Sequence, residues 1–228
     1  MNFGLSEEQE MIVNTVRSFV EKEIYPHEDL VEQSAEVPRE IAQDIKQKTI
    51  DMGFYACNFP ESVGAAGLSH VDFALVEREL GRGSMALTHF FGRPQNILMA
   101  CQGTQVERYL RPAIRGEKMD ALAMTEPGAG SDVRGMACSA QRAGGDWVLN
   151  GNKHFISGAE HADFVIVFVA TGVDETPRGP KKRITTFLVD RGTPGFTIRE
   201  GYKSVSHRGY KNMILEFDNC RLPDSQVL

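Results

Sequence analysis

The chain has 228 residues, of which 41% are hydrophobic and 25% are charged, and its formal net charge at pH 7 is -6. This composition is typical of a globular protein with a packed core, and the length suffices for one large domain or two small ones. The acidic balance excludes a general surface for nucleic acid or anionic membranes, because those partners select a clustered positive field. We therefore expect neither partner.

The first half of the chain has the periodicity of helices. Ser6 and Gln9 form a capping box, and apolar residues recur at helical spacing from Ile12 to Ile24, so we expect a helix that ends at Pro26. Further helices are predicted over residues 38–53, 69–80, about 84–101 and 104–114.

After Gly116 the pattern changes to short segments that are rich in β-branched and aromatic residues. Strands are predicted over residues 121–125, 137–142, 147–149, 154–156, 164–170, 184–189, 196–199 and 213–217. Gly144-Gly145 and Asn150-Gly151 have the composition of hairpin turns, and the basic run Lys181 to Arg183 is interpreted as a solvated hairpin tip. The sequence therefore predicts a multidomain α+β protein, in which an N-terminal all-α helical domain (1–117) precedes an antiparallel β-barrel or sandwich domain (118–228).

The cysteines and the N-terminus bear on compartment and on metal binding. The four cysteines form no CxxC pair, and His154 and His161 have no third ligand at a zinc-like spacing, so we expect reduced thiols and no metal. The segment Met1 to Gly4 runs directly into acidic residues without the features of a secretory signal, so we expect a cytoplasmic protein. The longest apolar run, Phe164 to Ala170, is far shorter than the ~20 residues of a membrane span.

The most informative segment is Thr125-Glu126-Pro127-Gly128-Ala129-Gly130-Ser131-Asp132. Its glycines allow positive φ and close approach, so that consecutive backbone N–H groups can converge on an anion such as phosphate. Taken alone, however, a turn of this composition can equally be a connection between strands.

Two further motifs follow in order, namely Asn150-Gly151-Asn152-Lys153-His154-Phe155-Ile156-Ser157 and then Arg208 ahead of Phe217-Asp218-Asn219-Cys220-Arg221-Leu222-Pro223. With the opening Leu5-Ser6-Glu7-Glu8-Gln9, these motifs make the chain resemble the acyl-CoA dehydrogenase family of flavoproteins over essentially its whole length. Members of that family continue with a C-terminal helical bundle that carries the catalytic glutamate. The resemblance therefore implies that the base lies beyond Leu228, and we assign no catalytic residue within the chain.

The resemblance implies FAD as the cofactor and assigns residues to it. The first motif would lie along the flavin, with Thr125 near the polar edge of the ring, Gly130 and Ser131 near the pyrophosphate, and Ser131 also facing the CoA thioester. The expected cofactor-binding residues of this motif are Leu122, Ala123, Met124, Thr125, Gly130 and Ser131. Neutral donors on a two-glycine turn suit this task, because no side chain obstructs the phosphates.

The second motif contributes Phe155, Ile156 and Ser157, where the family usually has Trp-Ile-Thr packed against the isoalloxazine. Phe and Ser keep the chemical type, although Phe155 offers a smaller contact area. In the third motif the usual hydroxyl residues are replaced by Tyr210 and Asn212, so no role is transferred to those two positions.

Arg93 lies in the stretch that, in the family, borders the acyl end of the substrate pocket. Because a charge is rarely buried unless it is paired, Arg93 either recognises a polar or carboxylated acyl tail or forms a structural ion pair. We name Arg93 and Ser131 as the substrate-binding residues.

The function implied by the resemblance is FAD-dependent α,β-dehydrogenation of an acyl-CoA thioester, with electrons passed to an electron-transfer flavoprotein by a homo-oligomer, in this family usually a tetramer. Two classes of alternative remain. One is another flavin enzyme on the same fold, such as a monooxygenase or an enoyl-CoA reductase, and the other is a non-catalytic, truncated binding or interaction subunit. We expect the isolated chain to be inactive.

Overall fold

The computed structural model describes residues 4–177 and 179–228, so part of the N-terminal segment examined for a signal lies outside the described residues. The chain forms two compact units. A helical unit contains the residues up to Asn96 together with Ile114–Glu117 and Ser204–Tyr210. A β unit contains Ile97–Ala113, Lys118–Lys203 and Lys211–Leu228. The chain thus crosses between the units several times, and the domain boundary at residue 117 remains a prediction.

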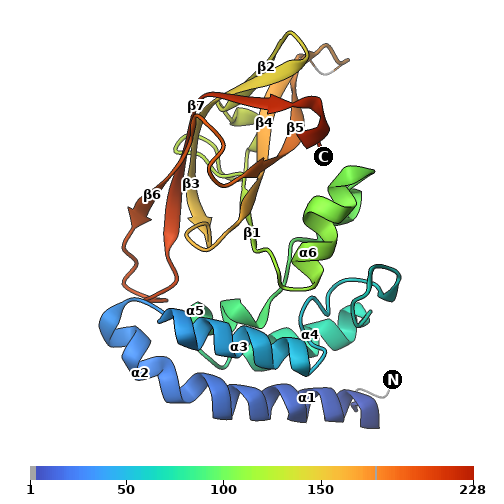
Figure 1. The fold of residues 1–228 in the computed structure, drawn as a ribbon, viewed down its shortest axis with the longest axis vertical. Coiled ribbons are helices and arrows are strands. Elements are labelled where there is room, and N and C mark those ends of the chain that lie inside the picture. The colour runs from blue at the N-terminus through green and yellow to red at the C-terminus, as the bar shows by residue number, and fades with distance from the viewer. Residues whose placement is uncertain (1–3, 178) are drawn as a thin grey trace. The chain divides into compact units, whose positions relative to one another are not determined.

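The α-helices carry the labels of Figure 1. In chain order the helical elements are α1 (Glu7–Phe19), the π-helical η1 (Val20–Ile24), α2 (Tyr25–Ser34), α3 (Arg39–Asp51), η2 (Glu61–Val63), α4 (His70–Leu80), α5 (Met85–Thr88), η3 (His89–Phe91), η4 (Asn96–Ala100), the π-helical η5 (Val106–Leu110), α6 (Arg111–Ile114), η6 (Val133–Gly135) and η7 (Asp224–Gln226).

The first helix begins as predicted, because the Gln9 amide donates to Ser6 Oγ at 3.2 Å and the Ser6 amide donates to Gln9 Oε1 at 3.1 Å. The prediction that this helix ends at Pro26 is wrong. The chain passes through η1 into α2, with Pro26 in the first turn of α2. Proline is tolerated there because the first helical N–H groups have no intrahelical partner.

The predicted helices around α3 and α4 are present, and Ser69 caps α4 by accepting from the Asp72 amide. The long helix predicted over residues 84–101 is wrong, since it is divided after η3. Gly92 there has a φ of 82°, and an added Cβ would lie 1.9 Å from the Tyr55 ring. The close approach of Tyr55 and the left-handed backbone end the helix before Pro94.

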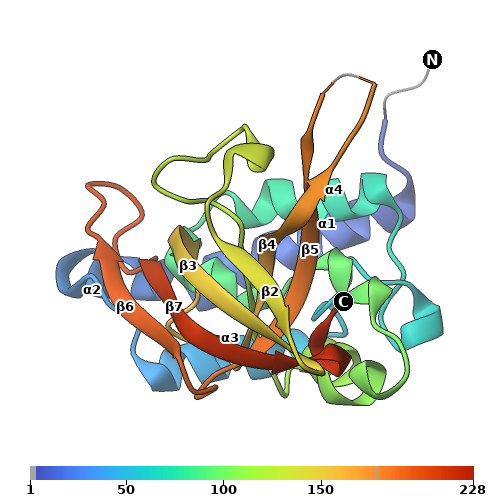
Figure 2. The ribbon, with the colours of Figure 1, turned by 90° about the horizontal axis from the view of Figure 1, so that it is seen from above.

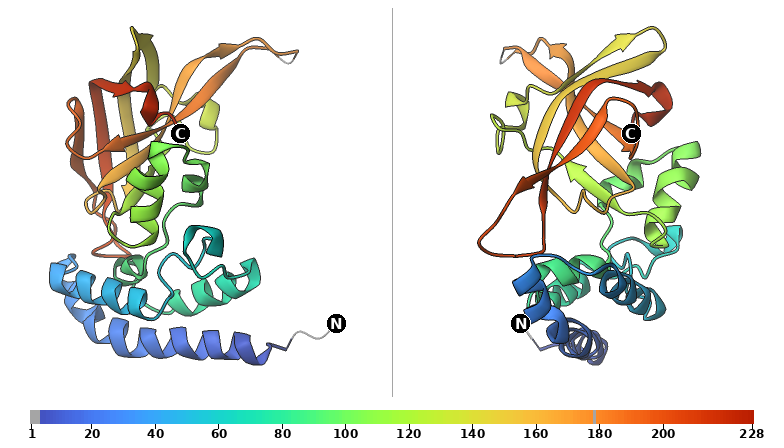
Figure 3. Two further views of the ribbon diagram at one scale, coloured as in Figure 1. Left: turned by 45° about the vertical axis from the view of Figure 1, so that its right-hand side comes forward. Right: turned by 60° about the vertical axis from the view of Figure 1, so that its left-hand side comes forward.

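The β unit is built on one seven-stranded sheet. Its strands are β1 (Asp120–Ala123), β2 (Ser139–Ala143), β3 (Asp146–Ser157), β4 (Phe164–Asp174), β5 (Lys181–Asp190), β6 (Phe196–Tyr202) and β7 (Asn212–Pro223). The order is β1-β4-β2-β3-β7-β6, with β5 pairing β4. Figure 3 shows that the sheet is strongly curled, and Figure 2 shows β4 and β5 extending as a long hairpin.

Helices followed by a curled sheet confirm the predicted fold class. The sheet is mixed, however, because β1 and β2 pair parallel to β4 whereas the other neighbours are antiparallel. The curled sheet surrounds a hydrophobic core that includes Ala123, Leu149, Val167, Phe187 and Leu215.

Two turn predictions within the β unit have different outcomes. Gly144-Gly145 makes the hairpin between β2 and β3, as predicted. Asn150-Gly151 is not a turn but lies inside β3 beside a register shift, and the prediction of a hairpin there is wrong. A glycine is required at position 151 because the backbone lies close to Cys138, so that an added Cβ would be 2.7 Å from Cys138 Cα. The basic run Lys181 to Arg183 begins β5 instead of forming the hairpin tip.

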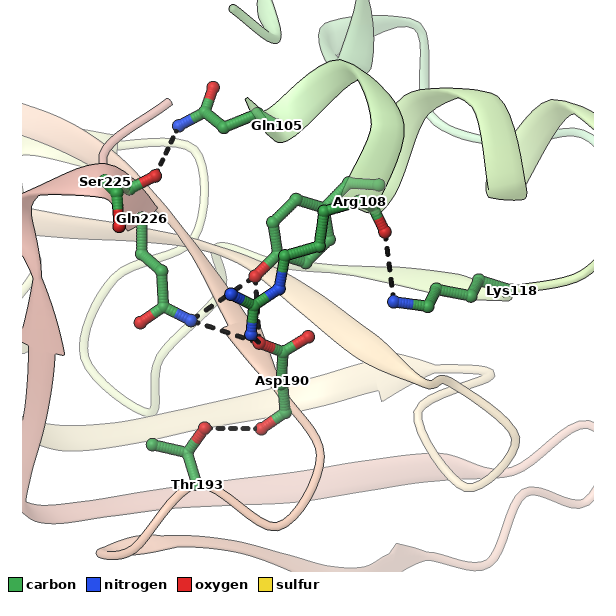
Figure 4. Close-up of polar contacts among 8 residues, drawn as sticks. Gln105, Arg108, Lys118, Asp190, Thr193, Ser225 and Gln226 are labelled. Carbon is green, nitrogen blue, oxygen red and sulfur yellow. Dashed lines mark hydrogen bonds and ion pairs between the residues drawn. The ribbon is translucent and has the colours of Figure 1, made fainter. Parts of the chain in front are cut away.

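Polar contacts fix the C-terminal turn η7 (Asp224–Gln226) inside the β unit, as Figure 4 shows. Gln105 Nε2 donates to the carbonyl oxygens of Ser225 and Val227 at 2.9 and 2.6 Å. The Tyr109 hydroxyl donates to Asp190 Oδ2 at 2.9 Å, and that same carboxylate accepts a hydrogen bond from Gln226. The segment that carries η5 and α6 is thereby held against β5 and the last turn.

Candidate functional site

The glycine-rich motif forms the connection from β1 to β2. We call residues 127–136 the glycine loop. It opens with a tight turn, in which the Glu126 amide donates to the Ala129 carbonyl at 3.0 Å and the Ala129 amide donates back at 3.2 Å. Pro127 and Gly128 occupy the centre of that turn, where proline is favoured at the first central position.

The presence of two glycines in the motif is explained by the open space around them and not by their backbone conformation. Neither Gly128 nor Gly130 has a φ in the left-handed region, so the expectation that they supply positive φ is wrong. No heavy atom lies within 4 Å of a Cβ built on either residue, and both are exposed together with Ser131. The loop therefore presents open backbone that a ligand can approach closely.

A buried ion pair lies where the glycine loop begins and ends. Glu126 and Lys153 have side chains that are 4% and 0% exposed, and their Oε1 and Nζ atoms lie 2.7 Å apart. The Glu126 carboxylate also accepts from the backbone amides of Ala137 at 2.6 Å and Cys138 at 3.1 Å. Lys153 donates in addition to the Met124 carbonyl at 3.0 Å. One pair of charges thus joins β3, which carries Lys153, to the residue that follows β1 and to the two residues that precede β2.

The protonation state of Glu126 follows from these contacts. Burial alone would raise the pKa of the carboxyl group, but the hydrogen bonds from Lys153 and the Ala137 amide, with the Lys153 charge, outweigh it and lower the pKa below its ordinary value of 4.5. Glu126 is therefore a carboxylate at neutral pH.

The second motif lies directly beside the first. The backbone amide of His154 donates to the Thr125 carbonyl at 2.8 Å, at a register shift in the pairing of β3 with β7. Phe155 follows with a φ of 58°, and its side chain is 53% exposed. A non-glycine residue in this conformation costs about 1–3 kcal/mol and persists only where its surroundings impose it. The bulge turns an aromatic ring outward beside Thr125.

Tyr202 of β6 completes this aromatic surface. Its ring stacks on Phe155 with centroids 4.3 Å apart and an interplanar angle of 17°. The Tyr202 hydroxyl lies 2.7 Å from His154 Nδ1. Stacked, partly exposed rings provide a flat apolar surface with a polar edge, which suits a planar ligand.

The other predicted residues of the two motifs differ in accessibility. Leu122, Met124 and Thr125 are half-buried. Ala123 and Ile156 are buried in the sheet core, so only their backbone could meet a ligand. Ser157 is half-buried, and its hydroxyl donates to Asn212 Oδ1 at 2.8 Å.

Arg93 belongs to the helical unit. Its Nε atom is 3.2 Å from Glu77 Oε1, and its side chain is 23% exposed. Its Nη1 atom is buried without a hydrogen-bond partner within the described residues. The arginine thus has a structural partner, and one nitrogen remains available for another.

The sequence alone assigned no role to Lys153, although it belongs to the second motif, nor to Tyr202 or Asn212. Lys153 had a detectable signal, because a lysine stands at an inward-facing position of a strand between Leu149 and Ile156, where a charge requires a partner. Asn212 lies opposite Ser157 in the pairing of β3 with β7, and Tyr202 lies opposite Asn212 in the pairing of β6 with β7; neither pairing has a local signature in the sequence.

Within residues 4–177 and 179–228, no group of three or more His, Cys, Asp or Glu side chains is arranged to hold a metal ion. Over the same residues, no helix is both long and apolar enough to cross a membrane.

Comparison with known proteins agrees with the motifs. The model of the "Acyl-CoA dehydrogenase, N-terminal domain" matches residues 6–117, and that of the "Acyl-CoA dehydrogenase, middle domain" matches residues 121–220. Benzylmalonyl-CoA dehydrogenase of Aromatoleum aromaticum is 34% identical over 100% of this chain and 59% of its own length. The 3-(aryl)acrylate reductase of Clostridium sporogenes is also 34% identical, over 98% of this chain and 58% of its own length.

Among solved structures, a glutaryl-CoA dehydrogenase from Mycobacterium smegmatis in complex with FADH2 aligns with a TM-score of 0.84 and 30% identity, covering 98% of this chain and 55% of that protein. The chain therefore spans between half and two thirds of the length of these relatives. Two family models that together cover nearly the whole chain, and a fold shared along its length, identify it: the chain belongs to the acyl-CoA dehydrogenase family and corresponds to that family's N-terminal and middle domains.

Proposed function

We propose that this chain forms the flavin-binding part of an FAD-dependent acyl-CoA dehydrogenase. The observation that carries the proposal is the contact between the two motifs, in which the His154 amide donates to the Thr125 carbonyl. The open glycine loop follows closely after Thr125 in the chain, and the exposed Phe155 ring follows directly after His154. The loop can accept a phosphate on its backbone, and the aromatic surface can accept a flat ring. The residues present thus fit both chemical parts of FAD.

Each residue of the chain has a distinct task in this proposal. Exposed amides and the Ser131 hydroxyl around Gly130 hold the pyrophosphate, and the half-buried Thr125 hydroxyl donates to the polar edge of the ring. Phe155 packs on the ring and excludes water from that side. The Ser157 hydroxyl gives up its hydrogen bond to Asn212 and donates to the ring instead. When bound, FAD supplies the acceptor for a hydride, which none of the twenty side chains provides.

We assign the substrate as an acyl-CoA thioester and its desaturation as the reaction. The base that removes the α proton is proposed to come from the family's C-terminal helical domain, because we find no residue of the described chain that matches it. An electron-transfer flavoprotein as acceptor and a tetrameric assembly are further parts of the proposal that rest on the family. We also propose a cytoplasmic location, as expected from the sequence. We likewise propose residue 117 as the boundary between its two domains.

Reduction of an enoyl-CoA or related acrylate is the second candidate. It is favoured by one observation, which is that a relative named as a reductase is as similar to this chain as one named as a dehydrogenase. Dehydrogenation and reduction would use the same face of the flavin, so the residues of this site do not discriminate between the two reactions.

Turnover assays test the proposal. We expect the 228-residue chain to bind FAD but to give no sustained turnover with acyl-CoA thioesters and an artificial electron acceptor. When the family's C-terminal helical domain is supplied on the same polypeptide, an acyl-CoA should reduce the flavin under anaerobic conditions. Sustained turnover by the 228-residue chain alone would show that the base lies within it, and failure of any acyl-CoA or enoyl-CoA to react with the extended protein would favour a binding subunit.

A further inference from the structure

We propose that the buried Glu126–Lys153 pair is a positioning device, which holds the glycine loop and the Met124–Thr125 backbone in the geometry that receives FAD. The inference rests on the proposed function and deepens it, because it assigns a role to two buried residues that the proposed function does not place in contact with FAD. Both are positioning residues and not catalytic ones.

The contacts of Glu126 close the glycine loop at its base. The loop lies between Glu126 and Ala137, and the Glu126 carboxylate accepts hydrogen bonds from the backbone amides of Ala137 and Cys138. A single side chain thus fixes the separation of the two loop ends. The exposed residues between them, which include Gly128 and Gly130, inherit their position from this closure.

The contacts of Lys153 extend the same restraint to the second motif. Lys153 donates both to Glu126 and to the Met124 carbonyl, and it is followed directly by His154, whose amide donates to Thr125. Phe155 comes next in the chain. The ion pair therefore fixes the proposed phosphate loop and the proposed ring-packing residue to one another.

Stability alone does not account for this arrangement. Taking two charges out of water is unfavourable, and apolar residues of similar volume often stabilise a fold equally well. An apolar pair could not accept two backbone amides or donate to a carbonyl. The geometry of the main chain around the loop is what the charges provide.

A second buried carboxylate supplies the matched control. Glu79 in α4 is 2% exposed and pairs with Arg17 of α1 at 3.0 Å, so its removal also breaks an ion pair. Its pKa, like that of Glu126, is lowered, here mainly by the hydrogen bond from Arg17. Within residues 4–177 and 179–228, the side chains of Arg17 and Arg78 donate hydrogen bonds to Glu79, and no residue of either flavin motif does so.

The experiment compares the purified chain with Glu126→Gln, with the double variant Glu126→Gln/Lys153→Met and with Glu79→Gln. Three quantities are measured, namely the FAD dissociation constant from flavin fluorescence, the exchange rates of the Cys138 and His154 amides without FAD, and the thermal midpoint. The double variant removes both charges at once and leaves neither one unpaired, so it is the variant expected to remain folded.

We expect both Glu126 variants to bind FAD about tenfold more weakly or worse, as when one orienting charged hydrogen bond is lost, and to exchange the two amides faster. Glu79→Gln should lower the thermal midpoint and leave both other readouts unchanged. Unchanged FAD affinity and unchanged amide exchange in a folded double variant would overturn the proposal, as would a double variant that fails to fold, which would assign the pair to the fold itself. If the unaltered chain binds no FAD, the proposed function fails, while the exchange rates still decide whether the pair positions the loop.

Discussion

The backbone amide of His154 donates to the carbonyl oxygen of Thr125 across 2.8 Å. This bond joins two motifs that lie far apart in the sequence, and it does so at the bulge that turns the Phe155 ring outward. The loop that we propose for the pyrophosphate and the surface that we propose for the ring are therefore neighbours within one unit. This relationship underlies the predictions for flavin binding.

Gly130→Val should weaken FAD binding without destabilising the chain. The residue is exposed, and open space surrounds the position of its Cβ, so the free energy of unfolding should change by no more than about 0.5 kcal/mol. The added side chain would occupy the space that the proposal gives to the pyrophosphate. Gly145→Val is the matched control, because Gly145 is equally exposed and open but lies in the β2–β3 turn. Equal FAD affinity of the two variants, measured by fluorescence titration, would remove the glycine loop from the site.

Phe155→Ala and Phe155→Gly separate backbone strain from ring contact. Both variants lose the stacking on Tyr202 and should lose FAD affinity to the same extent. Only glycine relieves the left-handed φ of 58°, so it should be more stable than alanine by about 1 kcal/mol in denaturant unfolding. A glycine variant that is no more stable than the alanine variant would show that the bulge is not strained.

Acid should destabilise the β unit partly through Glu126. Because its pKa is lowered from 4.5 in the folded chain, its contribution to stability is complete above the unfolded pKa and is lost as the pH falls through the folded pKa. We expect the free energy of unfolding to decrease below about pH 5, and less steeply in Glu126→Gln. Chemical denaturation at a series of pH values measures both slopes, and identical slopes would contradict the assignment.

Arg93→Met distinguishes a structural arginine from one that recognises substrate. Loss of the pairing with Glu77 should reduce stability, and a second change, Glu77→Gln, should restore part of it. In a polypeptide extended by the family's C-terminal helical domain, recognition of an anionic acyl end predicts that the activation free energy derived from kcat/KM rises by about 2 kcal/mol more for a dicarboxyl-type acyl-CoA than for a plain alkyl one. Equal losses on both substrates would leave Arg93 with its structural role alone.

Local signals predicted most of the fold and less of the site. Caps and breakers located the starts of α1 and α4. The predicted strand segments fall on β1 to β7, although two of them, 147–149 and 154–156, are parts of the single strand β3. Pro26 and Asn150-Gly151 led to wrong predictions. A proline is also tolerated in the first turn of a helix, and Gly151 is needed because the backbone lies close to Cys138 there. These outcomes depend on neighbours that a single sequence does not display.

The candidate site shows the same division. Thr125, Gly130 and Phe155 could be named from their motifs, whereas the contacts that fix them could not. Lys153 reaches Glu126 across the interior of the curled sheet, and Tyr202 reaches Phe155 through the pairing of β6 with β7. Such partners are set by tertiary pairing and register, which local composition does not encode.

Titration of the purified, flavin-free chain with FAD tests the central claim most directly. The account predicts saturable quenching of flavin fluorescence at one equivalent per chain, weakened by Gly130→Val and by Phe155→Ala but unaffected by Gly145→Val. Absence of saturable binding, or binding that none of these substitutions alters, would contradict the claim that the glycine loop and the Phe155 surface together receive the flavin.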